Sequence, residues 1–280
     1  MPKPRNKAGT SKFILALGTL ATFAVIGGVI YQSQVATDYG PEYVSLPEPV
    51  AEPVNLAAPV PEAFIAPPKD TTLTPDPSAP ATAVTKLPSI DNSDGFIRER
   101  MLVMKHAAEL EKWLSSDDLV RRSASYVDGL ARGLTLHKVL PLTAPEGNFA
   151  THTEGEIIWL NAGNYERYDT AVEAIASLNM QSMAQMFHFT RPLLESAFAE
   201  MGYQPRQMDG IILQALDNIL ATPIIVEPIR LKRESVAYKF TDPNLEGLMP
   251  LQKQLLRAGP ANTQRIQEQA LSLQEALLRP

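Results

Sequence analysis

The sequence predicts a mainly α-helical fold that combines one membrane-spanning helix, a proline-rich disordered linker and a helix-dominated globular domain with one or two small β-hairpins. Three observations predict this class. Residues 13–30 form an uncharged apolar run, residues 37–88 hold half of the 24 prolines, and residues 91–280 repeat a capping residue followed by spaced apolar residues. The three regions therefore differ in physical character.

Residues 13–30 can cross a bilayer once. As a helix they would extend about 27 Å, close to a hydrocarbon core of roughly 30 Å. Four lysines and arginines precede the run and five acidic residues follow it before the next lysine, so the positive-inside rule places the N-terminus in the cytoplasm and residues 32–280 outside it. A cleaved signal peptide is disfavoured because the run is long and no small-x-small cleavage site follows it. A buried core helix is disfavoured because three glycines weaken the run and no polar face is present.

Residues 37–88 contain twelve prolines, seven acidic residues and two lysines. Proline removes a hydrogen-bond donor and favours extended backbone, so neither helix nor sheet can propagate. We predict a disordered spacer that reaches roughly 160 Å fully extended or about 40 Å as a coil. A docking motif for an aromatic-lined module is the alternative. The predicted layout is a cytoplasmic tail (1–12), an anchor helix (13–31), a linker (32–90) and a helical domain (91–280).

The last region has the size and charge of one acidic globular domain. It carries 24 Asp and Glu against 19 Lys and Arg, which argues against a nucleic-acid partner. Its 190 residues suffice for one core. The chain has no cysteine, so disulfides, thiolate nucleophiles and thiolate metal ligands are excluded.

Capping residues and glycines divide this domain into helices. We expect Ser93, Asp117, Asp169, Asn179 and Asp242 to begin helices. The expected helices cover residues 94–114, 118–133, 170–178, 180–201, 208–221, 243–258 and 261–278, with a hairpin over 149–160 that turns at Glu154-Gly155 and a strand over 236–240. On the last helix Ile266, Ala270, Leu273 and Leu277 form a seam; we favour packing onto the domain over self-association, because the seam covers only two heptads.

Several motifs resemble those of one known family. They are Arg121-Arg122, Ala131-Arg132-Gly133, Tyr165-x-Arg167-Tyr168-Asp169, Tyr238-Lys239-Phe240-Thr241-Asp242-Pro243-x-Leu245-Glu246 and Gln252-Lys253-Gln254-Leu255-Leu256-Arg257-x-Gly259-Pro260-x-Asn262. In these the chain resembles an uncharacterised bacterial family of membrane-anchored proteins, catalogued as domain of unknown function number three thousand and fourteen. The resemblance covers nearly all of residues 88–270 and implies an inner-membrane anchor with the helical domain in the periplasm. It implies no activity, cofactor or catalytic residue.

Three of these motifs gather polar residues that could form a site. The candidates are Tyr165, Arg167, Tyr168, Asp169, Tyr238, Lys239, Lys253 and Arg257. One interpretation is a polar groove for an anionic or glycan ligand, with arginine and tyrosine as hydrogen-bonding anchors. The other, which we favour, is that these side chains hold the domain's own elements together, since arginine and tyrosine do both.

Motifs for nucleotides, zinc, calcium or a serine nucleophile are absent from the sequence, so no metal, cofactor or catalytic residue is predicted. His152, Glu154 and Glu156 alternate as metal ligands on a strand would, but Glu154-Gly155 is the expected turn. We therefore interpret them as the exposed residues of a hairpin.

A methionine pattern is the second candidate for metal binding. Met180, Met183, Met186 and His188 could suit copper(I), because thioethers and imidazole are ligands that copper(I) accepts. We favour core packing, since the same residues lie on one broad helix face and methionine commonly fills gaps in cores.

Together these observations favour a non-enzymatic interaction or scaffold module of the bacterial cell envelope, anchored in the inner membrane and facing an envelope protein or the cell wall. The alternative is an enzyme acting on cell-wall glycan or peptide, which would need two carboxyl groups roughly 5–10 Å apart, one of them in an apolar pocket. A metal-handling accessory protein rests only on the methionine spacing.

Overall fold

The structure, a computed structural model, describes residues 60–68, 87–104, 108–136, 148–234 and 237–279. The predicted anchor (13–31) and most of the predicted linker lie outside these ranges. None of the helices within the described ranges combines the length and the hydropathy that a membrane span requires.

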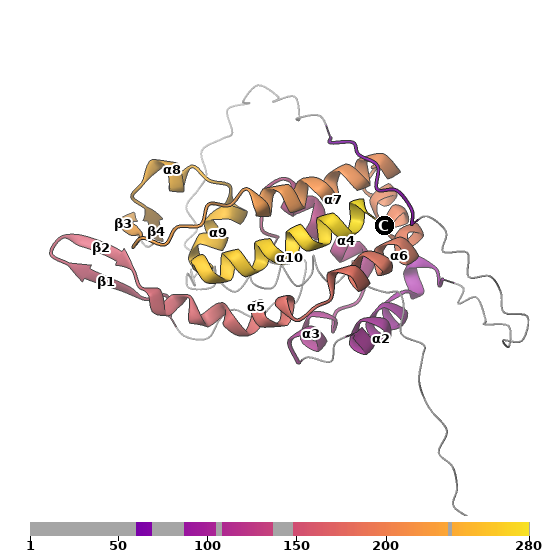
Figure 1. The fold of residues 1–280 in the computed structure, drawn as a ribbon, viewed down its shortest axis with the longest axis horizontal. Coiled ribbons are helices and arrows are strands. Elements are labelled where there is room, and N and C mark those ends of the chain that lie inside the picture. Colours follow the sequence, from indigo (N-terminus) through magenta and orange to yellow (C-terminus); the bar gives the residue numbers. More distant parts are fainter. Residues whose placement is uncertain (1–59, 69–86, 105–107, 137–147, 235–236, 280) are drawn as a thin grey trace, which may run out of the picture.

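The described part is helix-dominated, as predicted, with one small sheet (Figure 1). Short 3-10 turns cover Ile90–Asn92, Ala162–Asn164 and Glu166–Tyr168. The helices are α2 (Asp94–Met104), α3 (Ala108–Trp113), α4 (Leu119–Ala131), α5 (Asp169–Ala176), α6 (Met180–Glu200), α7 (Pro205–Leu220), α8 (Pro243–Glu246), α9 (Pro250–Ala258) and α10 (Pro260–Leu278). The strands are β1 (Thr151–Glu154), β2 (Ile157–Leu160), β3 (Arg230–Glu234) and β4 (Ala237–Phe240).

Helix α10 lies at the centre of the helical layer. It packs against α5, α6, α7 and α9, while α4 packs against α6 and α7 on the other side of the core (Figure 1). The predicted seam residues Ile266, Ala270, Leu273 and Leu277 are each 0% exposed. The prediction that this helix packs onto its own domain is therefore confirmed.

The two hairpins join into one sheet at one end of the domain. Strand order is β1-β2-β3-β4 and every neighbouring pair is antiparallel. The predicted hairpin is confirmed, with its turn at Gly155-Glu156, one residue later than predicted, because Glu154 still pairs with Ile157. The predicted strand at 236–240 pairs with β3, which was not predicted. Leu160, Leu231 and Phe240 from the sheet bury a second apolar cluster with Leu256 of α9, so the sheet is attached to the bundle by packing.

The predicted cap of the second helix is wrong. Helix α4 begins at Leu119, and Asp118 before it has a left-handed backbone with φ of 57° and makes no capping bond. The carboxylate of Asp94, at the start of α2, accepts hydrogen bonds from the backbone N–H groups of Asp118 (2.7 Å) and Leu119 (2.8 Å) instead. A residue distant in sequence replaces the expected local cap Asp117, and so fixes α2 against α4.

Other predicted boundaries hold in part. Asn179 and Asp242 cap α6 and α8 through their side chains, as predicted. Asp169 lies inside the first turn of α5 rather than before it, because the preceding 3-10 turn runs directly into the helix. The predicted helix 94–114 corresponds to α2 and α3, and residues 105–107 between them lie outside the described residues.

The structure also departs from the predicted linker (32–90) at residues 60–68. This segment, the indigo stretch in Figure 1, is extended and lies against the domain, and Ile65 is 0% exposed. A further part of the predicted linker, residues 87–90, contributes Leu87 and Ile90 to the main core. Proline content correctly excluded helix and sheet for residues 60–68 but did not exclude docking.

We expect Asp94→Ala to destabilise the protein by about 1–2 kcal/mol, because it removes the acceptor for two N–H groups at the start of α4. Asp117→Ala, at the exposed position predicted as the cap, should change stability by less than about 0.5 kcal/mol. Thermal unfolding of the full-length chain, followed by circular dichroism, measures both. Equal losses in the two variants would contradict the assignment of Asp94 as the cap.

Candidate functional site

The structure separates the predicted polar cluster into three groups. Tyr168, in the 3-10 turn before α5, lies close enough to Arg257 of α9 for each group to shift the pKa of the other. Tyr165 and Asp169 both accept hydrogen bonds from Asn262 of α10. The remaining residues each contact a different partner: Arg167 contacts Asn164, Tyr238 contacts Phe149, Lys239 contacts Glu234 and Lys253 contacts Glu246.

Arg257 links α9 to the sheet. Its guanidinium lies over the ring of Phe240, 5.6 Å from the centroid, and donates to Gln254 Oε1 at 3.2 Å. Burial lowers the pKa of Arg257, opposed by the neighbouring Tyr168 and Glu246. Tyr168 is 1% exposed, and burial raises its pKa to about 12. Tyr168 is therefore enclosed within the fold, and Arg257 is half-buried between Phe240 and Gln254.

Glu246 joins the other basic residue of α9 to β4. Lys253 Nζ donates to Glu246 Oε1 at 2.9 Å and to the Glu246 carbonyl at 3.0 Å, while the backbone N–H of Phe240 donates to Glu246 Oε2 at 2.9 Å. Burial raises the pKa of Glu246, but the hydrogen bonds from Lys253 and Phe240 and the positive charges of Lys253 and Arg257 outweigh it, so the net shift is downward. This carboxylate is thus a structural link and stays ionised.

The two predicted residues of β4 differ in exposure: Tyr238 is half-buried against the second apolar cluster, whereas Lys239 is exposed. Tyr238 packs its ring 5.8 Å from that of Phe149, measured between centroids. Lys239 pairs with Glu234 at 2.5 Å, and Lys232 pairs with the same carboxylate at 2.8 Å. Hydrogen bonds from these two lysines lower the pKa of Glu234 to about 2. They form an exposed charged surface on the sheet rather than part of an enclosed site.

Asn164, which the sequence analysis did not select, orders the segment that carries Arg167. Asn164 is 1% exposed and bonds both ways with Ala150, accepting from its N–H at 2.8 Å and donating to its carbonyl at 2.7 Å. Arg167 Nη1 approaches Asn164 Oδ1 at 3.4 Å. The 3-10 turns before α5 are therefore tied to the start of the hairpin.

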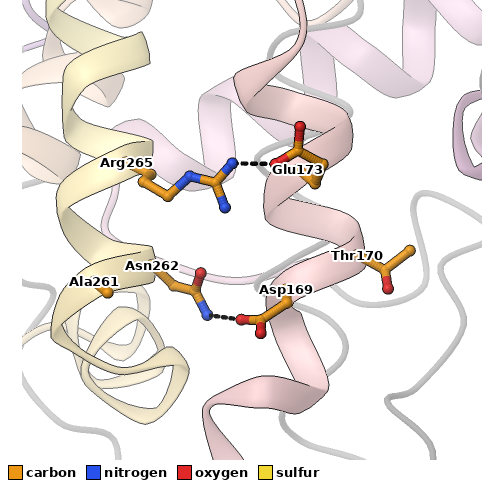
Figure 2. Close-up of a pocket in the computed structure, with 6 residues that line it drawn as sticks. All are labelled: Asp169, Thr170, Glu173, Ala261, Asn262 and Arg265. Carbon is orange, nitrogen blue, oxygen red and sulfur yellow. Dashed lines mark hydrogen bonds and ion pairs between the residues drawn. The ribbon is translucent and has the colours of Figure 1, made fainter.

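Helices α5 and α10 enclose a surface hollow of about 600 Å³, shown in Figure 2. Two bridges cross it: Arg265 pairs with Glu173, and Asn262 donates to Asp169 at 2.9 Å. Thr170 points away from α10. Each of the two carboxylates accepts a hydrogen bond or ion pair from α10. The charged and amide side chains that line the hollow are therefore paired with one another, and they join α5 to α10.

A smaller hollow of about 260 Å³ continues from the first past Asn262 to Tyr165. The backbone of Gly259, with φ of 91°, lies on the Tyr165 ring, and an added Cβ would come within 2.4 Å of Tyr165 Cγ. Asn262 donates to the carbonyls of Tyr165 and Ala258, both at 3.1 Å. The glycine and asparagine of this motif are thus needed for the α9–α10 turn.

These contacts support the interpretation that the polar cluster holds the domain together. Asp169 and Glu173 are both exposed carboxylates bound to α10. A glycosidase-type site needs one carboxyl group in an apolar pocket, and neither residue lies in one.

The other predicted patterns also have structural roles. His152, Glu154 and Glu156 are exposed on the hairpin, as the favoured interpretation stated. Among the described residues, no group of three or more His, Cys, Asp or Glu is placed to hold a metal ion.

The methionine pattern belongs to the core. Met180, Met183 and Met186 are 3%, 0% and 0% exposed and lie in the main apolar cluster. His188 is half-buried, and burial, followed by the charge of Arg191, lowers its pKa. The packing interpretation is confirmed for the three methionines.

A site that sequence analysis missed lies where α6 meets the start of α7. Asp209 is the one Asp or Glu among the described residues that is fully buried, at 0% exposure. Its Oδ2 accepts from Arg191 Nη2 at 2.9 Å and from the backbone N–H of Ile65 at 2.9 Å. A buried carboxylate is stable only when it is paired with a positive charge and hydrogen-bonded. Arg191 supplies the positive charge, and the Ile65 N–H supplies the second hydrogen bond.

The segment is held mainly through its backbone. The N–H of Ala63 donates to the carbonyl of Arg206 at 3.0 Å, and Arg191 Nη1 makes a long contact of 3.4 Å with the Ile65 carbonyl. An added Cβ on Gly210 of α7 would lie 2.2 Å from the Pro61 carbonyl oxygen. Gly210 therefore allows an extended chain to lie directly on the helix backbone.

The ion pair between Arg191 and Asp209 stabilises this site. Burial lowers the pKa of Arg191, but hydrogen bonds and charges from Asp209 and Glu195 outweigh it, so the net shift is upward. The second oxygen of Asp209, Oδ1, has no hydrogen-bond partner in the structure. The carboxylate thus depends on Arg191 and on the Ile65 N–H.

One side chain anchors the segment. Ile65 is its fully buried side chain, worth about 2–3 kcal/mol, whereas neighbouring Phe64 is 58% exposed. Each ordered residue costs about 1–2 kcal/mol of backbone entropy, reduced at Pro61, Pro67 and Pro68 because proline is already restricted. Burial of Ile65 therefore offsets only part of the cost of ordering residues 60–68, and the backbone hydrogen bonds must contribute as well.

Two signals in the sequence point to this site. Phe64 and Ile65 are the only Phe and Ile between residues 37 and 88, so they stand out from the composition of a spacer. Gly210 lies inside a helical pattern, where glycine commonly marks a close approach of another chain segment. Neither signal identifies its partner, because the two segments are about 145 residues apart.

We expect Glu246→Gln to lower stability by about 1–2 kcal/mol at pH 7, because it removes a charge that accepts two hydrogen bonds. The pKa of Glu246 is depressed in the folded state, so its contribution is present above the unfolded pKa of about 4.5 and is lost as pH falls through the folded pKa. Thermal unfolding of both proteins at pH 7 and pH 3 measures this.

The difference between wild type and Glu246→Gln should shrink at the lower pH. Glu227→Gln, at an exposed glutamate, provides the control and should match the wild type at both pH values. A Glu246→Gln difference that is independent of pH would contradict the role assigned to the ionised carboxylate.

Comparison with known proteins identifies the family. The chain matches the family model described as Protein of unknown function (DUF3014) over residues 119–274, which is more than half of its length. No curated protein and no solved structure matches the chain. The matched range runs from the start of α4 into α10 and includes Arg191, Asp209 and Gly210. The chain therefore belongs to the DUF3014 family, as the motif resemblance implied.

Proposed function

We propose that this protein is a membrane-anchored interaction module of the bacterial cell envelope, which acts by binding an extended segment of another envelope protein rather than by catalysis. The observation that carries the proposal is the buried Asp209. Its carboxylate accepts a hydrogen bond from the backbone N–H of an extended chain segment at 2.9 Å, and hydrogen bonds to the main chain are a source of affinity in peptide recognition.

The placement in the envelope rests on the sequence. The apolar run at residues 13–30 with basic residues before it and acidic residues after it favours a single anchor, with the domain in the periplasm. The acidic proline-rich residues that follow favour a spacer. An anchored domain on a spacer suits a protein that meets its partner at a distance from the lipid surface.

Site-specific photo-crosslinking in intact cells tests the proposed function. A photoreactive residue at Arg206, which is exposed and accepts a hydrogen bond from the N–H of Ala63 through its carbonyl, should capture a specific envelope protein. The same residue at Glu156, exposed on the β1–β2 hairpin, is the control. Capture at Glu156 alone would retain an interaction function but move it to the sheet; cell-wall fragments alone at every position would contradict it.

Topology has a separate test. Because the chain has no cysteine, Ser78→Cys introduces a single thiol. We expect a membrane-impermeant maleimide to label it in cells with a permeabilised outer membrane and an intact inner membrane. Labelling only after inner-membrane lysis would overturn the proposed orientation.

A further inference from the structure

The site on α6 and α7 contacts few side chains of the segment that it binds. Its polar contacts go to the backbone of Ala63 and Ile65. Its one fully enclosed side chain is Ile65, while Phe64 is 58% exposed. The chemistry that it selects is therefore an extended backbone with free N–H groups and one buried aliphatic side chain. Pro61 on one side and Pro67-Pro68 on the other restrict the backbone to extended conformations.

The residues that bind and the residues that are bound belong to different parts of the chain. Arg191, Asp209 and Gly210 lie within the family match, whereas residues 60–68 precede it. Only residues 69–86 separate the segment from the rest of the described domain, a span of at most about 65 Å. A tethered segment at this distance has an effective concentration in the millimolar range, so even a weakly held segment occupies the site.

We infer that this groove is a peptide-binding site for an extended, proline-bordered segment of a second protein with an aliphatic residue at the position of Ile65, and that residues 60–68 occupy it in cis until that segment displaces them. This inference rests on the proposed interaction function and specifies its ligand and its control. Main-chain recognition makes exchange straightforward, because any extended segment presents the same N–H and C=O groups.

Binding of a fluorescent synthetic peptide with the sequence of residues 60–68, blocked at both ends, tests the inference. The receptor is the full-length chain in detergent micelles, and fluorescence polarisation is the measurement. Wild type should bind the peptide weakly because its own segment competes. Ile65→Asp places a charge in the buried position beside Asp209, so it should release the cis segment and raise the peptide affinity at least tenfold.

Two further variants complete the design. Phe64→Asp changes the exposed neighbour of Ile65 and should bind the peptide as wild type does. Ile65→Asp combined with Gly210→Ala should lose the gain, because the added methyl group occupies the place of the Pro61 carbonyl. Circular dichroism verifies that each variant is folded. Gly210→Ala should not weaken α7 itself, because alanine is favoured over glycine within a helix.

Equal peptide affinity in wild type and Ile65→Asp, or strong binding that survives Gly210→Ala, would overturn the inference. A wild-type dimer in sedimentation velocity that Gly210→Ala abolishes would overturn it differently, by assigning the groove to the segment of a second copy. If the peptide fails to bind while cellular crosslinks at Glu156 persist, the interaction function stands and only the peptide site is rejected.

Discussion

The burial of one face of α10 is the interaction on which the rest of the structure depends. The chain has no disulfide to restrict its unfolded state, so packing must supply the stability. With Ile266, Ala270, Leu273 and Leu277 fully buried, α10 fixes α5, α6, α7 and α9 around one axis. Polar residues of α10 add further links. The side-chain amide of Gln267 donates to three backbone carbonyls at the end of α7, those of Ile219, Leu220 and Thr222. These are acceptors that the end of a helix leaves without a partner inside the helix.

The packing of several short elements around α10 explains why many polar motif residues have structural roles. Four carboxylates on three helices, those of Asp94 on α2, Asp169 and Glu173 on α5 and Glu246 on α8, each join their own helix to another part of the fold through a hydrogen bond or ion pair. Short helices and a four-stranded sheet bury modest apolar surfaces, so directional contacts are needed to set their relative positions. Arg121 does the same at the surface, where it pairs with Asp91, Asp118 and Glu200.

The site at Asp209 differs from these contacts in one respect. The other polar links join helices and strands of the domain to one another, whereas Asp209 holds an extended segment that has no regular secondary structure and precedes the matched residues. A buried carboxylate is costly to leave unpaired, so the site favours occupancy by an extended backbone. That requirement connects the chemistry of Asp209 to the proposed binding function.

The sequence by itself determined the helical class, the β1–β2 hairpin, the caps at Asn179 and Asp242, the seam of α10 and the family, because these depend on local periodicity, turn chemistry and motif spacing. Only the tertiary structure decided that Asp94 replaces Asp117 as the cap of α4, that two hairpins form one sheet, and that Ile65 docks at Asp209. Each of these joins residues distant along the chain. Apolar periodicity and capping rules describe neighbours in sequence, whereas a long-range partner is selected by the surface that remains uncovered once the helices have packed.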